Sequence, residues 1–143
     1  MVVSLDFQEL GTAEFADEMT FARAFADIFV RTLEINAASG MKEMSEPLAK
    51  LSGNYDAGLK ELFVQLSRLC SGSPRPIVLM IDEVDSASNN QVFVEFLALL
   101  RKYYLNRDET PIFHSVILAG VYDIKNLKLK LRPESEHQYN SPW

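Results

Sequence analysis

The stretch PIVLMIDEVDSAS (residues 76–88) joins five consecutive apolar residues to three acids that fall within four positions. A continuous apolar run of this length, bounded by a proline and by acids, is typical of a strand buried inside a sheet. The run stops at Asp82, and Glu83 and Asp85 follow it. The sequence therefore predicts a buried strand whose carboxyl end bears a group of carboxylates.

Strand and helix patterns alternate on both sides of this stretch. VVSLDF (residues 2–7) and FHSVILAGVYD (residues 113–123) are largely apolar runs, which predict two more strands. Three other segments have apolar residues at three- and four-residue steps, as amphipathic helices do: residues 12–36, 55–70 and 89–106. This alternation is typical of α/β proteins.

Turn-forming residues separate the predicted elements. Thr12 is the expected N-cap of the first helix, and SGMKEMSEPLAKLSGN (residues 39–54) is interpreted as a connector because it contains Gly, Ser and Pro. The strands are continuously apolar, which predicts a parallel sheet with helices on both faces, three layers in all. We expect residues 1–124 to form one incomplete domain core and residues 125–143, which lack clear periodicity, to form an irregular tail.

The composition is that of a single domain with a sizeable core, because 48% of the residues are hydrophobic. Fourteen basic and twenty acidic residues give a net charge of −6 without a dense basic block, so direct binding of nucleic acid is not expected. The sequence has no leader-like segment and no long apolar run, which predicts a cytoplasmic protein without membrane contact. Cys70 and the two histidines lack zinc-ligand spacing, and Cys70 is expected to be buried or half-buried.

Polar residues stand where each predicted strand stops. The carboxyl ends of parallel strands meet at one edge of a sheet, where α/β proteins bind ligands. Carboxylates at such an edge repel each other unless a cation lies among them, and magnesium prefers oxygen ligands. The residues concerned are Asp6 after the first strand, Asp82, Glu83 and Asp85 after the second, and Gly120, Tyr122 and Asp123 after the third.

IVLMIDEVD (residues 77–85) resembles the Walker B motif of bacterial AAA-like P-loop ATPases, in which at least four apolar residues precede Asp-Glu. The resemblance extends from residue 2 to about residue 122 and implies a partial P-loop NTPase-like fold. It implies that Asp82 holds magnesium through water and that Glu83 polarises the water that attacks the terminal phosphate of ATP. The alternative is that both acids cap the following helix and solvate a strand end.

The phosphate-binding motif of that family, G-x-x-x-x-G-K-[S/T], does not occur in these 143 residues. In the family, the P-loop strand and its helix come just before the strand that residues 2–7 resemble, so we expect the chain to be part of a longer ATPase. ATP and Mg²⁺ are then cofactors of the complete protein. The chain alone is expected to bind ATP weakly and not to hydrolyse it, because the phosphates lack backbone amides and a lysine.

Nucleotide-sensing residues are less clearly marked. Where the family often has a polar sensor residue, this chain has AGVYD (residues 119–123), so the sensor is Tyr122 or Asp123, or is absent. Asp6 and Asp85 are the other candidates, because both follow a strand that ends at the same edge.

Arg101 and Arg107 lie near the end of the third predicted helix, about where an arginine finger would reach a neighbouring subunit's phosphate. The alternative is that these side chains complement the helix dipole.

The resemblance also predicts an exposed strand edge. The family places the P-loop strand beside the strand that residues 113–120 resemble, so this strand, with Val116, Ile117 and Leu118, is expected to have a free side. Exposed apolar edges tend to pair, which predicts a homo-oligomer or covering of the edge by the tail. Two functions remain open: a part of an ATP-hydrolysing AAA-like domain, and a non-catalytic α/β protein-interaction module without nucleotide.

Overall fold

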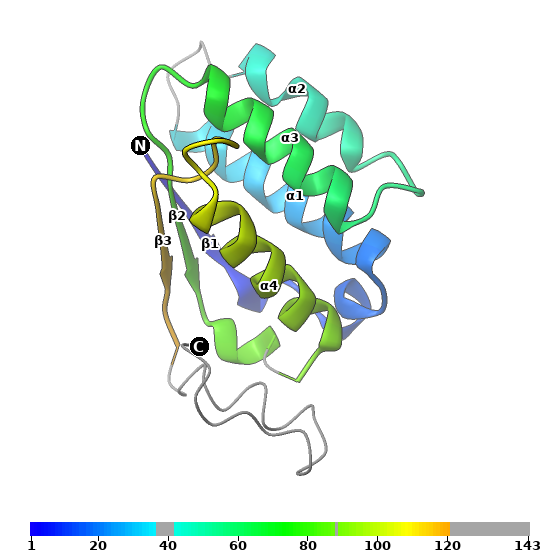
Figure 1. Cartoon of the computed structure of the whole chain (residues 1–143). Helices are drawn as coiled ribbons and strands as arrows, with labels where there is room; N and C mark the ends of the chain where they lie inside the picture. Colours follow the sequence, from blue (N-terminus) through cyan, green and yellow to red (C-terminus); the bar gives the residue numbers. More distant parts are fainter. Residues whose placement is uncertain (37–41, 88, 121–143) are drawn as a thin grey trace.

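The computed structural model describes residues 1–36, 42–87 and 89–120, and these contain one parallel three-stranded sheet (Figure 1). The strands are β1 (Val2–Asp6), β2 (Val78–Asp82) and β3 (Ser115–Leu118), and β2 lies between the other two. The three predicted strands and their parallel pairing are therefore confirmed.

Four α-helices and three short 3-10 helices connect the strands. The α-helices are α1 (Glu18–Asn36), α2 (Lys42–Leu51), α3 (Leu59–Gly72) and α4 (Gln91–Leu105). The 3-10 helices are η1 (Phe7–Glu9), η2 (Thr12–Phe15) and η3 (Val84–Ala87). The mixed α/β class predicted from the sequence is confirmed.

The first helix begins later than predicted. Thr12 opens the separate 3-10 turn η2, and Asp17 caps α1 instead, because Asp17 Oδ1 accepts a hydrogen bond from Thr20 N at 2.7 Å. This backbone hydrogen bond is the main reason that the pKa of Asp17 lies below its usual value. The stabilisation is present above the unfolded-state pKa and is lost as the pH falls through the lower folded-state pKa.

The prediction of a connector over residues 39–54 was wrong, because α2 lies within it. Leu48 and Leu51 are buried, and Ser45 is buried on the same side of the helix. Pro47 is exposed on the opposite side, and Glu46 pairs with Lys50 one turn later. The apolar face of α2, packed against α1 and α3, outweighs the weak helix propensity of Pro and Ser in this segment.

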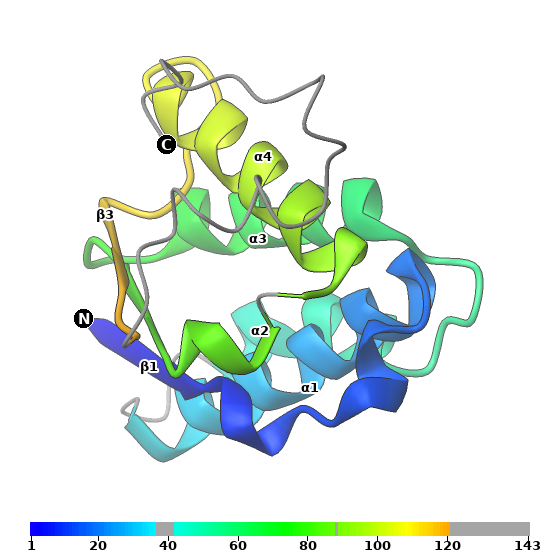
Figure 2. The ribbon, with the colours of Figure 1, turned by 90° about the horizontal axis from the view of Figure 1, so that it is seen from below.

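All four α-helices lie on the same side of the sheet (Figures 1 and 2). The chain passes from β1 to β2 and on to β3, always to the next strand in the same direction. Right-handed crossovers that step in one direction must all cross the same face of the sheet. The described residues therefore form two layers, and the third layer predicted from the apolar strands is not formed by them.

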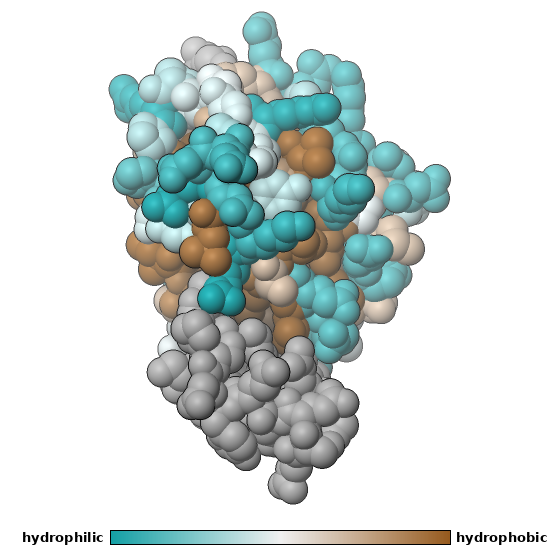
Figure 3. Space-filling view, in the orientation of Figure 1, coloured by the Kyte–Doolittle hydropathy of each residue, from teal (hydrophilic) through white to brown (hydrophobic). Residues whose placement is uncertain are grey.

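Burial alternates along β1 and β2 in agreement with this arrangement. Val3, Leu5, Leu79 and Ile81 point toward the helices and are buried. We call the other side of the sheet the open face, which consists of Val2, Ser4, Asp6, Val78, Met80, Asp82, Ser115 and Ile117. The space-filling view shows hydrophobic side chains at the margin of the molecule on the side of the strands (Figure 3).

Phenylalanine side chains fill the space between the sheet and the helices. All nine phenylalanines of the chain are buried, and their rings form one connected cluster. Phe7, directly after β1, is fully buried, and the centre of its ring lies 5.6–6.4 Å from those of Phe15, Phe21, Phe25 and Phe93. The phenylalanines of α1 therefore belong to the core.

Phe7→Ala is expected to lower the free energy of unfolding by about 3–5 kcal/mol, because it removes a ring that four others contact. Urea denaturation followed by circular dichroism measures the change. Ile35→Ala is the control, because the Ile35 side chain is 79% exposed and its loss should cost less than about 0.5 kcal/mol. A loss below about 1 kcal/mol for Phe7→Ala would show that the cluster is loosely packed.

Candidate functional site

The acidic residues predicted at the strand ends meet at the carboxyl edge of the sheet. Asp6 of β1 and Asp82 of β2 are partners in the parallel register, and both are exposed. Neighbouring strands lie about 4.8 Å apart, so these two carboxylates are neighbours. Glu83 follows Asp82 directly, and Asp85 lies in the η3 turn.

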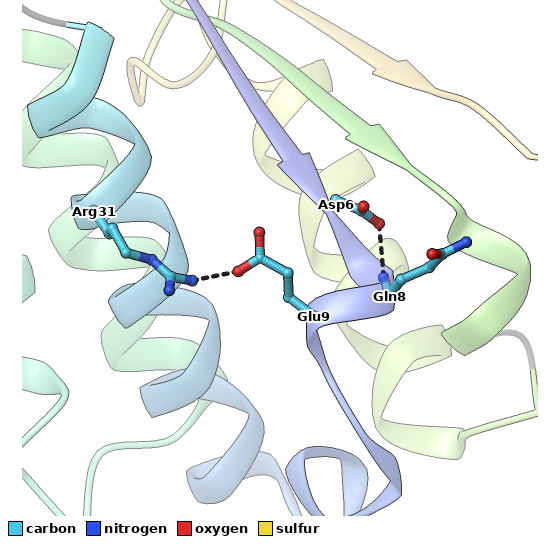
Figure 4. A network of polar contacts seen from close by, with 4 residues as sticks. All are labelled: Asp6, Gln8, Glu9 and Arg31. Carbon is cyan, nitrogen blue, oxygen red and sulfur yellow. Dashed lines mark hydrogen bonds and ion pairs between the residues drawn. The ribbon is translucent and has the colours of Figure 1, made fainter.

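Asp6 also has a structural role. Its Oδ1 accepts a hydrogen bond from Gln8 N at 2.8 Å, which caps η1. Glu9, at the end of η1, forms an ion pair with Arg31 of α1 (Figure 4). These contacts fix the chain where it leaves β1, so the position of the Asp6 carboxylate is defined by its own backbone.

The turn after β2 is held by short-range hydrogen bonds. Asp82 Oδ1 accepts from Glu83 N at 2.9 Å, and Ser86 Oγ donates to Glu83 O at 2.8 Å. Ser86 Oγ also lies 3.2 Å from Phe7 O, which connects η3 with the end of β1. The sequence analysis did not single out Ser86, whose only sequence signal was a hydroxyl residue within an acidic turn.

Glu83 has a strained backbone. Its φ is 55°, and among the described residues it is the one non-glycine residue with positive φ. A side chain in this left-handed region costs about 1–2 kcal/mol, and such strain is concentrated at functional sites. The strain turns the chain sharply at the residue to which the sequence assigned the catalytic role.

Asp85 lies against the chain that continues from β3. A Cβ atom placed on Gly120 would lie 2.8 Å from Asp85 Oδ2 and 2.8 Å from Val84 Cγ2. Val84 N donates to Ala119 O at 3.1 Å, so the two segments are also joined through the backbone. Any larger residue at position 120 would therefore make the Asp85 or Val84 side chain shift. Tyr122 and Asp123, the other predicted sensors, lie outside the described residues.

The arginine-finger candidates are at the other end of the sheet. Because β2 and β3 are parallel, α4 must return the chain to the amino ends of the strands, and Arg101 and Arg107 lie near its end (Figure 1). Arg107 Nη1 donates to Tyr104 O at 2.8 Å, and its guanidinium lies 4.3 Å from the centre of the Tyr104 ring. Neither arginine joins the acidic edge within one chain, and the bond from Arg107 to a carbonyl at the end of α4 agrees with the alternative that it complements the helix dipole.

Cys70 does not belong to the acidic edge, because α3 ends before the amino end of β2. It lies near the end of α3 and is half-buried, as predicted, and burial raises the pKa of its thiol to about 12. A thiol with such a pKa has almost no thiolate at neutral pH, so Cys70 is not a nucleophile.

Asp6 and Asp82 are the two residues of the acidic edge whose chemistry and placement suit a hydrated magnesium ion. In the part of the chain that the structure describes, no three His, Cys, Asp or Glu side chains are arranged to hold a metal ion. Magnesium is commonly bound by only one or two carboxylates, together with water and substrate phosphates. Two exposed, adjacent carboxylates with hard oxygen donors fit such a hydrated ion.

No protein-family model matches the chain, and neither a curated protein nor a solved structure matches it. Within residues 1–36, 42–87 and 89–120, no helix has the length and apolarity needed to cross a membrane.

Glu83→Gly is expected to raise the free energy of unfolding by about 1 kcal/mol, because glycine adopts φ of 55° without steric cost. Urea denaturation measures the change. Glu83→Ala is the matched control, since it removes the same carboxylate but keeps a Cβ atom. The two variants should differ by about 1 kcal/mol, and equal stability would show that the turn relaxes when the carboxylate is absent.

Proposed function

We propose that the carboxyl edge of the sheet is the magnesium-coordinating and water-polarising half of an ATP site. The observation that supports this most strongly is the strained backbone of Glu83, directly after Asp82 at the end of the central strand. This strained residue directly follows Asp82, which is paired in register with Asp6 of the neighbouring strand. A helix cap or a solvated strand end does not require a strained residue at this position.

Asp82 is the proposed residue for holding hydrated magnesium. The hydrogen bond from Glu83 N to Oδ1 orients its carboxylate, and its exposure leaves it accessible to an ion with its water shell. Asp6 adds a second negative charge beside it. When bound, magnesium neutralises charge on the nucleotide phosphates.

Glu83 is the proposed base that orients and polarises the attacking water. Its side chain is half-exposed, and its backbone carbonyl is held by Ser86 Oγ. A general base needs a fixed position within hydrogen-bond reach of its proton, and this turn provides a fixed backbone.

The phosphate-binding half of the site is proposed to come from a polypeptide segment other than these residues. The strand order β1-β2-β3 leaves β3 with a partner on one side within the described sheet. The resemblance to AAA-like ATPases implies that a P-loop strand lies on the other side of β3. Its loop would then reach the same edge as Asp82, because the carboxyl ends of parallel strands coincide.

The magnesium assignment predicts that Asp82→Asn weakens divalent-ion binding by about ten-fold or more, because it removes the charge from the proposed ligand. Mn²⁺ is a suitable probe, since it replaces magnesium and broadens the amide resonances of nearby residues. In the unmodified protein the broadening should centre on the amides of Asp6, Asp82 and Glu83.

Asp56→Asn is the control, because Asp56 is exposed in the loop between α2 and α3. Glu83→Gln should keep the broadening, because Glu83 is assigned to water rather than to the metal. Broadening that is equally strong in Asp82→Asn would exclude Asp82 as the ligand and contradict the proposal.

The second candidate function is a protein-interaction module, and the side of β3 that the described strands leave unpaired favours it. Val116 and Leu118 point toward the helices but remain half-buried, whereas their neighbours in β2, Leu79 and Ile81, are fully buried. β3 itself (SVIL) contains no charged residue and no proline, which are the usual protections of an edge strand. We propose that two copies of the chain pair through this edge.

Light scattering and sedimentation at micromolar concentration are expected to show more than one chain per particle. Ile117→Lys should shift the particle toward a monomer, because a charge on β3 opposes pairing. Val2→Lys is the control on the opposite edge strand, and it should leave the particle mass unchanged. A monomeric wild-type protein with exchange-protected amides in β3 would show that the edge is covered within one chain.

A further inference from the structure

The open face of the sheet combines apolar rows with an acidic row. Residues that are partners in the register of parallel strands point to the same side of the sheet. They form rows across the strands, with one residue from each strand that reaches the row. The rows are Val2, Val78 and Ser115, then Ser4, Met80 and Ile117, then Asp6 and Asp82. Val2 and Ile117 are 52% and 47% exposed. The face is mainly apolar over two rows and negative at the carboxyl edge.

The dimensions of this face match one helix. Three strands about 4.8 Å apart span about 10 Å between the outer two, and an α-helix with side chains is about 10–12 Å wide. A five-residue strand is about 17 Å long, which corresponds to about 11 helical residues, or three turns. One short helix therefore covers the open face, and there is no width for a second.

Charge decides the orientation of such a helix. Asp6 and Asp82 are exposed at one end of the face, and the amino end of a helix has a partial positive charge. A helix is therefore favoured when its first turn lies over these two acids and contains basic residues. Its direction is then opposite to that of the strands.

A second copy of the chain suits this face less well. In antiparallel stacking of two open faces, Asp6 and Asp82 of each copy would lie over Val2 and Val78 of the other, and these residues supply no positive charge. In parallel stacking, four carboxylates would come together. Both arrangements bury carboxylates without a basic partner, which is unfavourable.

We propose that the open face docks one amphipathic helix of another protein, about three turns long, apolar on one side and basic in its first turn. The helix packs on Met80 and Ile117 and places its amino end at Asp6 and Asp82. This docking goes beyond the proposed nucleotide site, and it would compete with magnesium because both use Asp6 and Asp82.

The test uses the full chain and a synthetic helical peptide of about 12 residues, with leucines spaced i, i+3, i+4, i+7 and two lysines in the first turn. Nuclear magnetic resonance should show peptide-induced shifts at the Met80 and Ile117 methyl groups. A peptide with glutamates in place of the lysines should bind about ten-fold more weakly at low salt, and the difference should shrink at about 1 M salt. A spin label at the peptide's amino end should broaden Asp6 and Asp82 rather than Val2 and Val78.

Met80→Glu is expected to weaken binding of the lysine peptide at least about ten-fold, because it places a charge in the centre of the contact. Val2→Glu is a second variant at a more exposed position of the same face. Ile35→Glu is the matched control, since Ile35 is an exposed apolar residue of α1.

Circular dichroism checks the fold of each variant, and Mn²⁺ broadening near Asp82 should be unchanged in Met80→Glu. Failure of peptide docking is thus distinguishable from failure of the magnesium assignment.

Three results would overturn the proposal. The first is equal affinity for the lysine and glutamate peptides. The second is a set of peptide-induced shifts confined to the helical side of the molecule. The third is a Met80 methyl that is already covered without peptide, which would assign the face to the chain's own residues, or to a second copy if the cover depends on protein concentration.

Discussion

The direction in which the chain steps across the sheet determines the rest of this structure. β1, β2 and β3 follow one another as neighbours, and parallel pairing requires each connection to return to the amino edge. Because both connections are expected to be right-handed, they cross one face and carry all four α-helices with them (Figure 2). The same rule explains three features at once: a phenylalanine core on one side, a face on the other that the described helices do not cover, and strand ends gathered at one edge.

The acidic edge depends on local backbone contacts as much as on the sheet. Asp6 caps η1, Asp82 receives the amide of Glu83, and Ser86 connects the η3 turn with Phe7. Phe7 in turn lies at the centre of the aromatic cluster. The packing of the core therefore defines the positions of the carboxylates, although the carboxylates themselves are solvent-accessible.

The sequence was sufficient to predict the strands and the acids at their ends, because a long apolar run followed by Asp and Glu has few structural interpretations. It was misleading for α2 and for the start of α1, where residues typical of turns or caps lie within or before a helix. Pro47 and the neighbouring glycine and serines are typical of a loop, so the sequence did not predict α2. This helix forms because Leu48 and Leu51 are buried. Thr12 is the first residue of a 3-10 turn, and Asp17, directly before α1, caps that helix instead. The apolarity of β2 was taken for burial on both faces, but Met80 belongs to the face that the described helices leave uncovered.

The glycine at position 120 has a consequence for the acidic turn. A Cβ atom at this position would lie 2.8 Å from Asp85 Oδ2, and the Val84 amide holds the adjacent carbonyl of Ala119. A larger residue at position 120 would therefore displace the Asp85 side chain. The end of the third strand thus sets how much room the carboxylate of the acidic turn has.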